Sequence, residues 1–167
     1  RMDDLTKNIP KPMLKINQKM LIDYAIEIAQ KISHHRIFVN THYQNQILES
    51  YIKENYLDIL ISHEPNILGT GGAIKKIQND DLLVLNTDNL WQETFVNEIK
   101  ESINFFNENE HVENLLLVNS NSEIFDLDMK NKNNINYPSI NHNTRFQGCH
   151  LIRNKSLDHY PDIFNIQ

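Results

Sequence analysis

HEPNILGTGGAIKKIQNDDLLVLNTDN, residues 63–89, is the stretch that decides the fold of this chain. It places three features in series. A glycine-rich turn at 68–72 opens a short amphipathic helix expected at 73–78. The apolar run 82–85 then predicts a strand buried on both faces, and it ends in the polar residues 86–88. The stretch therefore has the form of one α/β unit that ends in a carboxylate.

Both ends of this unit carry groups suited to a ligand. Glycines in a turn allow backbone N–H groups to approach a ligand that side chains would hold away. Asp88 lies just past the end of a buried strand, which is where open α/β sheets bind ligands. The alternative is an ordinary turn before a helix, with Asp88 as the N-cap of the next helix. The rest of the chain has to decide between the two interpretations.

Strand and helix patterns alternate on both sides of this stretch, as far as Asn119. Helices are expected at 18–33, 44–55 and 95–107, and strands at 36–40, 58–62 and 115–118, the last of them fully buried. Such alternation predicts βαβ units and an α/β fold with a largely parallel sheet. Polar side chains follow the strands, so they should gather along one edge of the sheet: Asn40, Glu64, Asp88 and Asn119.

The pattern changes after Asn119. A half-exposed strand is expected at 124–128, a turn at 130–136, and a further strand at 145–152. The last strand contains Gly148, and a glycine inside a strand often marks a close approach by a ligand or by another backbone segment. Trp91 is interpreted as an ordinary packing or rim residue.

The composition limits the classes of protein to consider. A length of 167 residues favours one domain, and 40% hydrophobic with 23% charged residues is typical of a globular protein. The net charge of −6 argues against a general nucleic-acid or membrane-surface binder. No apolar run approaches the length of a membrane span. Cys149 is the only cysteine and cannot form an internal disulfide, which favours a reducing cytoplasm.

Several other chemistries lack their motifs. The histidines show no metal-ligand spacing with cysteines or carboxylates, and no serine lies in a nucleophile elbow. The glycines at 69–72 have the wrong spacing for a dinucleotide fingerprint, and no Gly-Lys-Ser/Thr occurs. A different feature stands out near the start, where Pro10 and Pro12 fix the backbone on both sides of Lys11. That lysine is either presented to a ligand or part of a surface turn.

Taken together, these residues resemble the sugar-1-phosphate nucleotidyltransferases, closest to the mannose-1-phosphate guanylyltransferase and N-acetylmuramate-1-phosphate uridylyltransferase branch. The motifs that carry the resemblance are Arg1-Met2, Leu5-Thr6, Pro10-Lys11-Pro12-Met13, Asn40-Thr41-His42-Tyr43, Glu64, Leu68-Gly69-Thr70-Gly71-Gly72-Ala73, Asn86-Thr87-Asp88 and Phe146-Gln147-Gly148. They occur in order over nearly the whole chain. Thr87 stands where the family has the glycine of N-G-D.

The resemblance implies a Rossmann-like nucleotidyltransferase fold with a mainly parallel central sheet flanked by helices. It also implies a role for each matching residue: Lys11 and Arg1 as catalytic groups on the phosphates, Glu64, Gly69, Gly71 and Gly72 as the nucleotide-binding loop, Asn119 and Gly148 on the sugar side, and Asp88 as a ligand of Mg²⁺. The expected reaction joins a nucleoside triphosphate and a sugar-1-phosphate into an NDP-sugar and pyrophosphate.

The family signature begins with glycines that have no match here, and its second metal aspartate has no counterpart. Residues 1–167 are therefore expected to be a single catalytic domain, incomplete at both ends, with little activity on its own. The expected partners are the two small-molecule substrates, without nucleic acid or membrane, and self-association is left open. The alternative is a catalytically inactive nucleotide-sugar-binding or regulatory module on the same fold. The identities of the base and the sugar are also left open.

Overall fold

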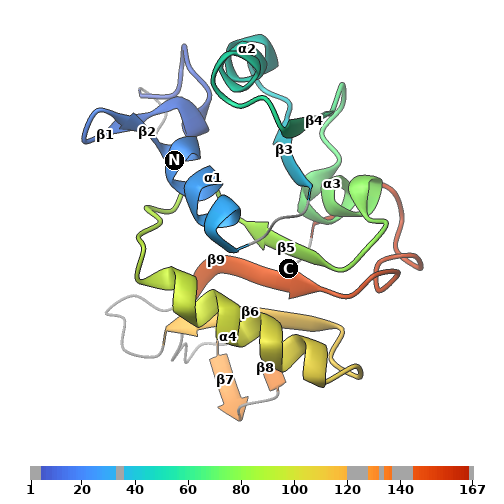
Figure 1. The fold of residues 1–167 in the computed structure, drawn as a ribbon. Coiled ribbons are helices and arrows are strands. Elements are labelled where there is room, and N and C mark those ends of the chain that lie inside the picture. Colours follow the sequence, from blue (N-terminus) through green and yellow to red (C-terminus); the bar gives the residue numbers. More distant parts are fainter. Residues whose placement is uncertain (1–4, 33–35, 120–127, 132–133, 137–144, 166–167) are drawn as a thin grey trace.

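The computed structural model describes residues 5–32, 36–119, 128–131, 134–136 and 145–165 (Figure 1). In chain order its elements are the 3₁₀ turn η1 (Lys11–Met13), β1 (Lys15–Ile16), β2 (Lys19–Met20), α1 (Leu21–Ile32), β3 (Ile37–Thr41), α2 (Asn45–Asn55), β4 (Ile59–His63), α3 (Gly69–Ile77), β5 (Leu82–Leu85), α4 (Phe95–Glu108), β6 (Asn114–Asn119), β7 (Asp128–Asn131), β8 (Asn134–Asn136) and β9 (Arg145–Ile152). Over these residues, none of the helices is long and apolar enough to cross a membrane.

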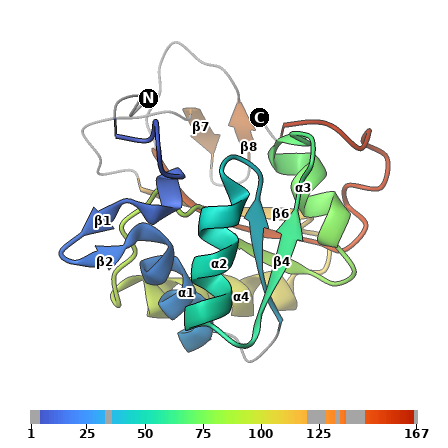
Figure 2. The ribbon, with the colours of Figure 1, turned by 90° about the horizontal axis from the view of Figure 1, so that it is seen from above.

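The strands pair in four groups, two of which form the centre of the fold. β3 and β4 are parallel neighbours that lie beside α2 (Figure 2). The second group has the order β5-β9-β6, and β9 is antiparallel to both of its neighbours. Because both flanking strands oppose β9, β5 and β6 run in the same direction. The α/β class is confirmed, and β9 adds an antiparallel strand to the expected parallel pattern.

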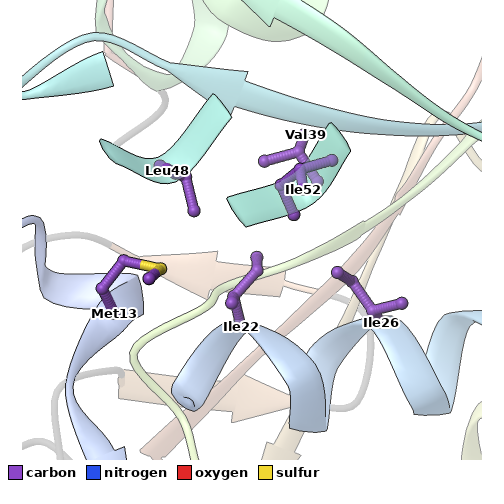
Figure 3. Packing of buried hydrophobic residues seen from close by; sticks show 6 residues of the cluster. All are labelled: Met13, Ile22, Ile26, Val39, Leu48 and Ile52. Carbon is purple, nitrogen blue, oxygen red and sulfur yellow. The ribbon is translucent and has the colours of Figure 1, made fainter. Parts of the chain in front are cut away.

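Helix α1 packs against both strand groups. Its residues Ile22 and Ile26 join Val39 of β3 in one buried cluster (Figure 3). Leu48 and Ile52 of α2 complete the contact. The next positions on α1, Ala25 and Ile28, belong to a second cluster: Trp91, Ile99 and Cys149. An apolar helix face this wide is what a helix buried on two sides requires. One helix therefore fixes the β3–β4 pair relative to β5-β9-β6.

The sheet β5-β9-β6 is covered on both faces. Cys149 of β9 points into the cluster formed with α1 and α4. Ile152 points to the opposite face, where it packs with Ile74 of α3 and with Leu157 in a third cluster. Alternate residues of a strand face opposite sides of a sheet. The result is a three-layer arrangement with α1 and α4 on one face and α3 on the other.

Three sequence-based expectations were wrong in detail. The helix expected at 18–33 begins at Leu21, because Asn17 and Gln18 take positive φ and turn β1 into β2. β5 and β6 are half-buried rather than fully buried, since among the described residues each pairs with β9 alone. The turn expected at 130–136 contains the paired strands β7 and β8. Most of the strand expected at 124–128 lies outside the described residues.

The expected glycine turn at 68–72 was also wrong in detail. Helix α3 begins at Gly69, so Gly71 and Gly72 lie inside its first turn rather than before it. Both are buried. They are buried because residues 162–164, a later segment of the chain, pack against this end of α3.

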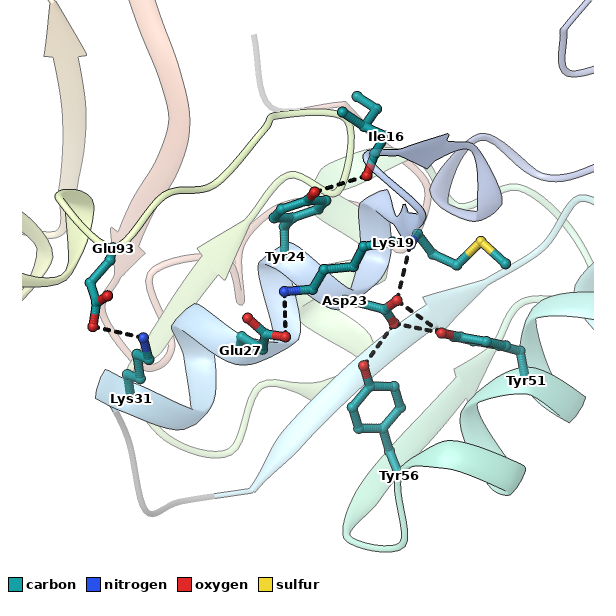
Figure 4. A network of polar contacts seen from close by, with 10 residues as sticks. Ile16, Lys19, Asp23, Tyr24, Glu27, Lys31, Tyr51, Tyr56 and Glu93 are labelled. Atoms are coloured by element: carbon teal, nitrogen blue, oxygen red, sulfur yellow. Dashed lines mark hydrogen bonds and ion pairs between the residues drawn. The ribbon is translucent and has the colours of Figure 1, made fainter.

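A buried carboxylate joins α1 to α2 and the loop after it. Asp23 accepts hydrogen bonds from the hydroxyls of Tyr51 (2.9 Å) and Tyr56 (2.7 Å), and from the backbone N–H of Met20 (3.0 Å; Figure 4). Burial raises the pKa of Tyr51 to about 12, and the bond to Asp23 acts in the same direction. Because folding raises this pKa, Tyr51 contributes to the free energy of unfolding below pH 10, and that contribution is lost as the pH rises towards 12.

Tyr56→Phe is expected to destabilise the protein by about 1–3 kcal/mol, because it removes a donor to a buried carboxylate. Tyr24→Phe is the matched control: it lies on the same helix as Asp23, and its hydroxyl bonds an exposed carbonyl, that of Ile16. The control should stay within about 0.5 kcal/mol of wild type. Urea unfolding at pH 7 measures both variants, and equal losses would show that the Asp23 cluster is not a specific anchor.

Candidate active site

Lys11 is presented by a short turn that is anchored in the core. Pro10 is buried in extended backbone, and its carbonyl accepts the N–H of Met13 at 2.8 Å. Met13 itself packs in the cluster of α1 and α2. The side chain of Lys11 is 44% exposed at the other side of this turn. The two prolines and the buried methionine thus hold a lysine at the surface in a defined position.

Asp88 lies in the turn that follows β5. The backbone N–H of Asn86 donates to the carbonyl of Gly148 at 2.7 Å, and the indole N–H of Trp91 donates to the carbonyl of Asn86 at 2.8 Å. Trp91 is fully buried and meets Phe95 edge to face. The start of the turn is therefore fixed, as is the chain just beyond it at Trp91, and the carboxylate of Asp88 is left 41% exposed between them.

Lys11 and Asp88 meet although 77 positions separate them in the sequence. Lys11 Nζ lies 2.6 Å from Asp88 Oδ2. Both side chains are exposed enough to water that the ion pair itself contributes little stability, on the order of 0–1 kcal/mol. A pair this weak is easily opened. Its importance is geometric, because it places a cation and a carboxylate at one point.

The chemistry of the Lys11–Asp88 pair is compatible with a Mg²⁺ ion that is bound together with phosphate groups. Over the described residues, no three histidine, cysteine or acidic side chains group together as an all-protein metal site. Mg²⁺ commonly takes one or two carboxylates and completes its shell with water and substrate phosphates. The half-exposed carboxylate of Asp88 fits that role, and Lys11 beside it fits the phosphate charge. Arg1, the other expected catalytic cation, lies outside the described residues.

Glu64 is buried directly after β4, in the loop that leads to α3. Its Oε2 accepts the backbone N–H of Leu68 at 3.0 Å, and its own backbone N–H donates to Thr41 at 2.8 Å. Its carbonyl accepts His42 Nδ1 at 2.8 Å. The other carboxylate oxygen, Oε1, is buried and has no partner among the described residues. A buried acceptor without a donor is costly, which makes a ligand donor at this position favourable.

The glycines after Glu64 already have a protein partner. The N–H groups of Gly71 and Gly72 donate to the carbonyl of Phe164, at 3.0 and 3.2 Å. A Cβ on Gly71 would collide with the ring of Phe164, and one on Gly72 with the carbonyl of Asp162. We call residues 160–165 the strap. The smallness of both glycines is explained by the strap, and contact of their N–H groups with a base remains a proposal.

Side-chain contacts also hold the strap. Lys75 Nζ donates to the carbonyl of Tyr160 at 2.7 Å and lies 3.0 Å from a carboxylate oxygen of Asp162. The rings of Tyr160 and Phe164 stack with centroids 4.8 Å apart. The backbone of Phe164 also bonds that of Leu68. The carbonyl of Phe164 therefore caps the positive end of α3. Of the glycines at this end of α3, Gly69 has a positive φ, +75°, a backbone conformation that side chains disfavour.

The two expected sugar-side residues lie near the end of β6. Asn119 is the last residue of β6, paired with Arg145, and it lines a cleft of about 620 Å³ between α4 and β6. Gln147 lines the same cleft. Gly148 follows in β9, with φ of +72°. Asn86 and Asn89 fill the space that a side chain at position 148 would occupy. Contacts within the protein are therefore enough to require a glycine there.

Two titratable groups follow Gly148 in β9, and burial shifts the pKa of each. Burial raises the pKa of the Cys149 thiol to about 12, which keeps it protonated and unreactive. Burial lowers the pKa of His150 to about 4, so its imidazole is neutral at pH 7. Neither residue therefore supplies a thiolate or an imidazolium at pH 7.

A family model matches most of the chain. The family model described as nucleotidyl transferase matches residues 1–123. Among curated proteins, the D-glycero-alpha-D-manno-heptose 1-phosphate guanylyltransferase of Campylobacter jejuni is 34% identical over 93 residues, covering 53% of this chain and 42% of that protein. The UTP--glucose-1-phosphate uridylyltransferase of Synechocystis is 32% identical over 90 residues, covering 47% and 23%. The chain thus spans less than half the length of these relatives.

Solved structures share the fold over nearly all of the chain's length. HddC from Yersinia pseudotuberculosis, solved with GMP-PN, superposes with a TM-score of 0.75 at 20% identity, covering 99% of this chain and 77% of that one. The inositol-1-phosphate CTP transferase from T. maritima gives a TM-score of 0.74 at 14% identity, covering 99% and 72%. At these identities the likeness concerns the fold.

Gly72→Ala is expected to dislodge the strap, because its methyl group would overlap the carbonyl of Asp162. Amide hydrogen exchange measures this: the N–H of Phe164, now bonded to Leu68, should exchange at least about tenfold faster. Thr70→Ala is the control, since it changes an exposed side chain in the same turn and leaves the backbone bonds intact. Unchanged protection of Phe164 in Gly72→Ala would contradict the strap's dependence on this glycine.

Proposed function

This chain belongs to the nucleotidyl transferase family, and we propose that it transfers a nucleotidyl group from a nucleoside triphosphate to a sugar-1-phosphate. Residues 1–167 act in this proposal as one catalytic domain. The products are an NDP-sugar and pyrophosphate. The relatives described above, whose names include guanylyl- and uridylyltransferases acting on sugar 1-phosphates, support the choice of reaction.

The reaction exchanges one phosphorus–oxygen bond for another. A phosphate oxygen of the sugar-1-phosphate attacks the α-phosphorus of the triphosphate and forms the new bond. The bond from the α-phosphorus to the oxygen that bridges to the β-phosphate breaks, and its electrons leave with pyrophosphate. Both substrates are anions, so the protein has to neutralise charge and align the reacting groups, and no protein nucleophile is required.

The observation that carries this proposal is the meeting of Lys11 with Asp88. The lysine ammonium, held by its proline-flanked turn, is placed to neutralise charge that develops on the α-phosphoryl oxygens. Asp88 supplies a carboxylate for Mg²⁺, whose positive charge, when it is bound, offsets that of the phosphates. Because the Lys11–Asp88 pair is weak and exposed, substrates can separate the two side chains at little cost. Arg1 adds a fork-shaped donor for the triphosphate in this proposal.

Glu64 favours guanine as the base. A carboxylate only accepts hydrogen bonds. The Watson–Crick edge of guanine offers two adjacent donors, N1–H and N2–H, whereas uracil and thymine offer one N–H between two carbonyls. Oε1 of Glu64, which is buried and has no partner in the described part of the chain, is suited to accept such donors, while Oε2 accepts the N–H of Leu68. Gly69 begins the helix just beyond this carboxylate, and in the proposal its backbone lies along the base. GTP is therefore the proposed triphosphate.

The inactive binding module on the same fold is the weaker candidate. A binding module would require Glu64 and the loop before α3. It would not require Lys11 to lie against Asp88, which follows a different strand, β5. The convergence of Lys11 and Asp88 therefore favours the enzyme. Asn119 and Gln147, which line the cleft beside α4, are proposed to lie on the sugar side, and Gly148 adds backbone contacts there. The proposed setting is the cytoplasm.

Glu64→Gln is expected to remove the preference for guanine. Isothermal titration with GTP, UTP, CTP, dTTP and ATP should show the tightest binding for GTP. In the variant GTP should bind about 10–100-fold more weakly, because a charge-assisted hydrogen bond is replaced by an opposed donor. Glu54→Gln, at an exposed position of α2, is the matched control.

The same set of triphosphates tests the reaction itself in the natural-length protein. Pyrophosphate release should require Mg²⁺ and a sugar-1-phosphate, and it should be fastest with GTP. Equal rates with GTP and UTP would contradict the role of Glu64. Tight GTP binding with no pyrophosphate release for any of a set of sugar-1-phosphates would favour the binding module instead.

A further inference from the structure

Gly148 is a glycine because of the turn that carries Asp88. A Cβ built on Gly148 would overlap the side-chain amide nitrogen of Asn89 and would lie 3.0 Å from the Cβ of Asn86. The positive φ of Gly148, +72°, adds backbone strain for any other residue. These two neighbours stand on either side of Asp88 in the sequence. The shape of β9 at this point is therefore matched to the turn, with no room left for a side chain.

Two consecutive carbonyls of β9 hold this turn. The carbonyl of Gly148 accepts the backbone N–H of Asn86 at 2.7 Å. The carbonyl of Gln147 accepts the side-chain amide of Asn89. Asp88 lies between the two anchors, and Asn89 is half-buried while Asp88 is exposed. The first anchor continues the pairing of β5 with β9, whereas the second depends on one side chain.

We propose that Asn89 is a positioning residue for Asp88 and that Gly148 is a glycine so that the Asn89 side chain fits against β9. The importance of this arrangement rests on the proposed role of Asp88 as a metal ligand beside Lys11. The exposed ion pair contributes too little to hold its own geometry. The direction of the Asp88 carboxylate must then be set by the turn. The indole of Trp91 holds the start of the turn, and the amide of Asn89, next to Asp88, ties its far end to β9.

The proposal can be tested without nucleotide or metal. A water-soluble carbodiimide joins an amine to a carboxylate as an amide only when the two are in direct contact, and mass spectrometry of the digest measures the yield. Lys11 and Asp88, 2.6 Å apart, should form this link readily in the wild-type protein. In Asn89→Ala the yield should fall about fivefold, which is the change in population expected for the loss of one ordinary hydrogen bond.

An internal reference separates positioning from general loosening. Lys31 and Glu93 form a second exposed pair, 2.8 Å apart, just beyond the same turn, and their yield should stay at the wild-type level in Asn89→Ala. Asn109→Ala is the matched control variant, since its amide also donates to a backbone carbonyl, that of Phe105. An unchanged Lys11–Asp88 yield in Asn89→Ala overturns the proposal, and so does an equal fall in both pairs.

The role of Gly148 is tested by combination. Gly148→Ala should lower the Lys11–Asp88 yield as Asn89→Ala does, because its methyl group displaces the Asn89 amide. Combined with Asn89→Gly, it should lower the yield by less than it does alone, since both changes break the same contact and only the crowding of Asn86 and the positive φ remain. A double variant with an additive loss would show that Gly148 acts separately from Asn89. Failure of the proposed function would appear in the triphosphate titrations and the pyrophosphate assay, whereas failure of the positioning appears in the link yields.

Discussion

The two-sided packing of helix α1 is the constraint on which the site depends. Ile22 faces the cluster with β3 and α2, while Ala25 and Ile28 face the cluster with Trp91, Ile99 and β9. Among the described residues, no strand of the β3–β4 pair is hydrogen-bonded to the sheet β5-β9-β6. Packing against α1 therefore holds the two groups of strands together. Met13, packed against the first cluster, carries the turn of Lys11, and Trp91, packed in the second, ends the turn of Asp88.

The site itself is built from interactions that differ in strength. The buried contacts beneath it are the strong ones, because removing a large buried side chain such as Trp91 costs about 3–5 kcal/mol. The exposed pair of Lys11 and Asp88 contributes on the order of 0–1 kcal/mol at most. This difference suits a site that has to exchange its internal partners for substrates. The fold supplies the position, and the charged groups remain free to change partners.

Patterns within short stretches allowed most of the fold to be predicted. Helical spacing identified α1, α2 and α4. The family motifs predicted Lys11 at the phosphates and Asp88 at the metal, and these roles stay predictions. Contacts between distant segments could not be predicted this way. Gly71, Gly72 and Gly148 were each expected to mark a close approach, by a ligand or, for Gly148, also by another backbone segment. The structure places Phe164, Asp162 and Asn89 against them, and their contact with a ligand stays a prediction. A glycine pattern shows that something approaches closely, and only the tertiary structure shows what it is.

The central claim is that Lys11 acts on the phosphates during transfer, from a position set beside Asp88. Comparison of turnover with triphosphate affinity in Lys11→Ala of the natural-length protein tests it most directly, with Lys15→Ala, at an exposed position of β1, as the control. The account predicts that kcat falls at least about a hundredfold, or roughly 2.7 kcal/mol of barrier, while the Kd for the triphosphate changes much less. A kcat within about threefold of wild type, under ~1 kcal/mol of barrier, would contradict the account.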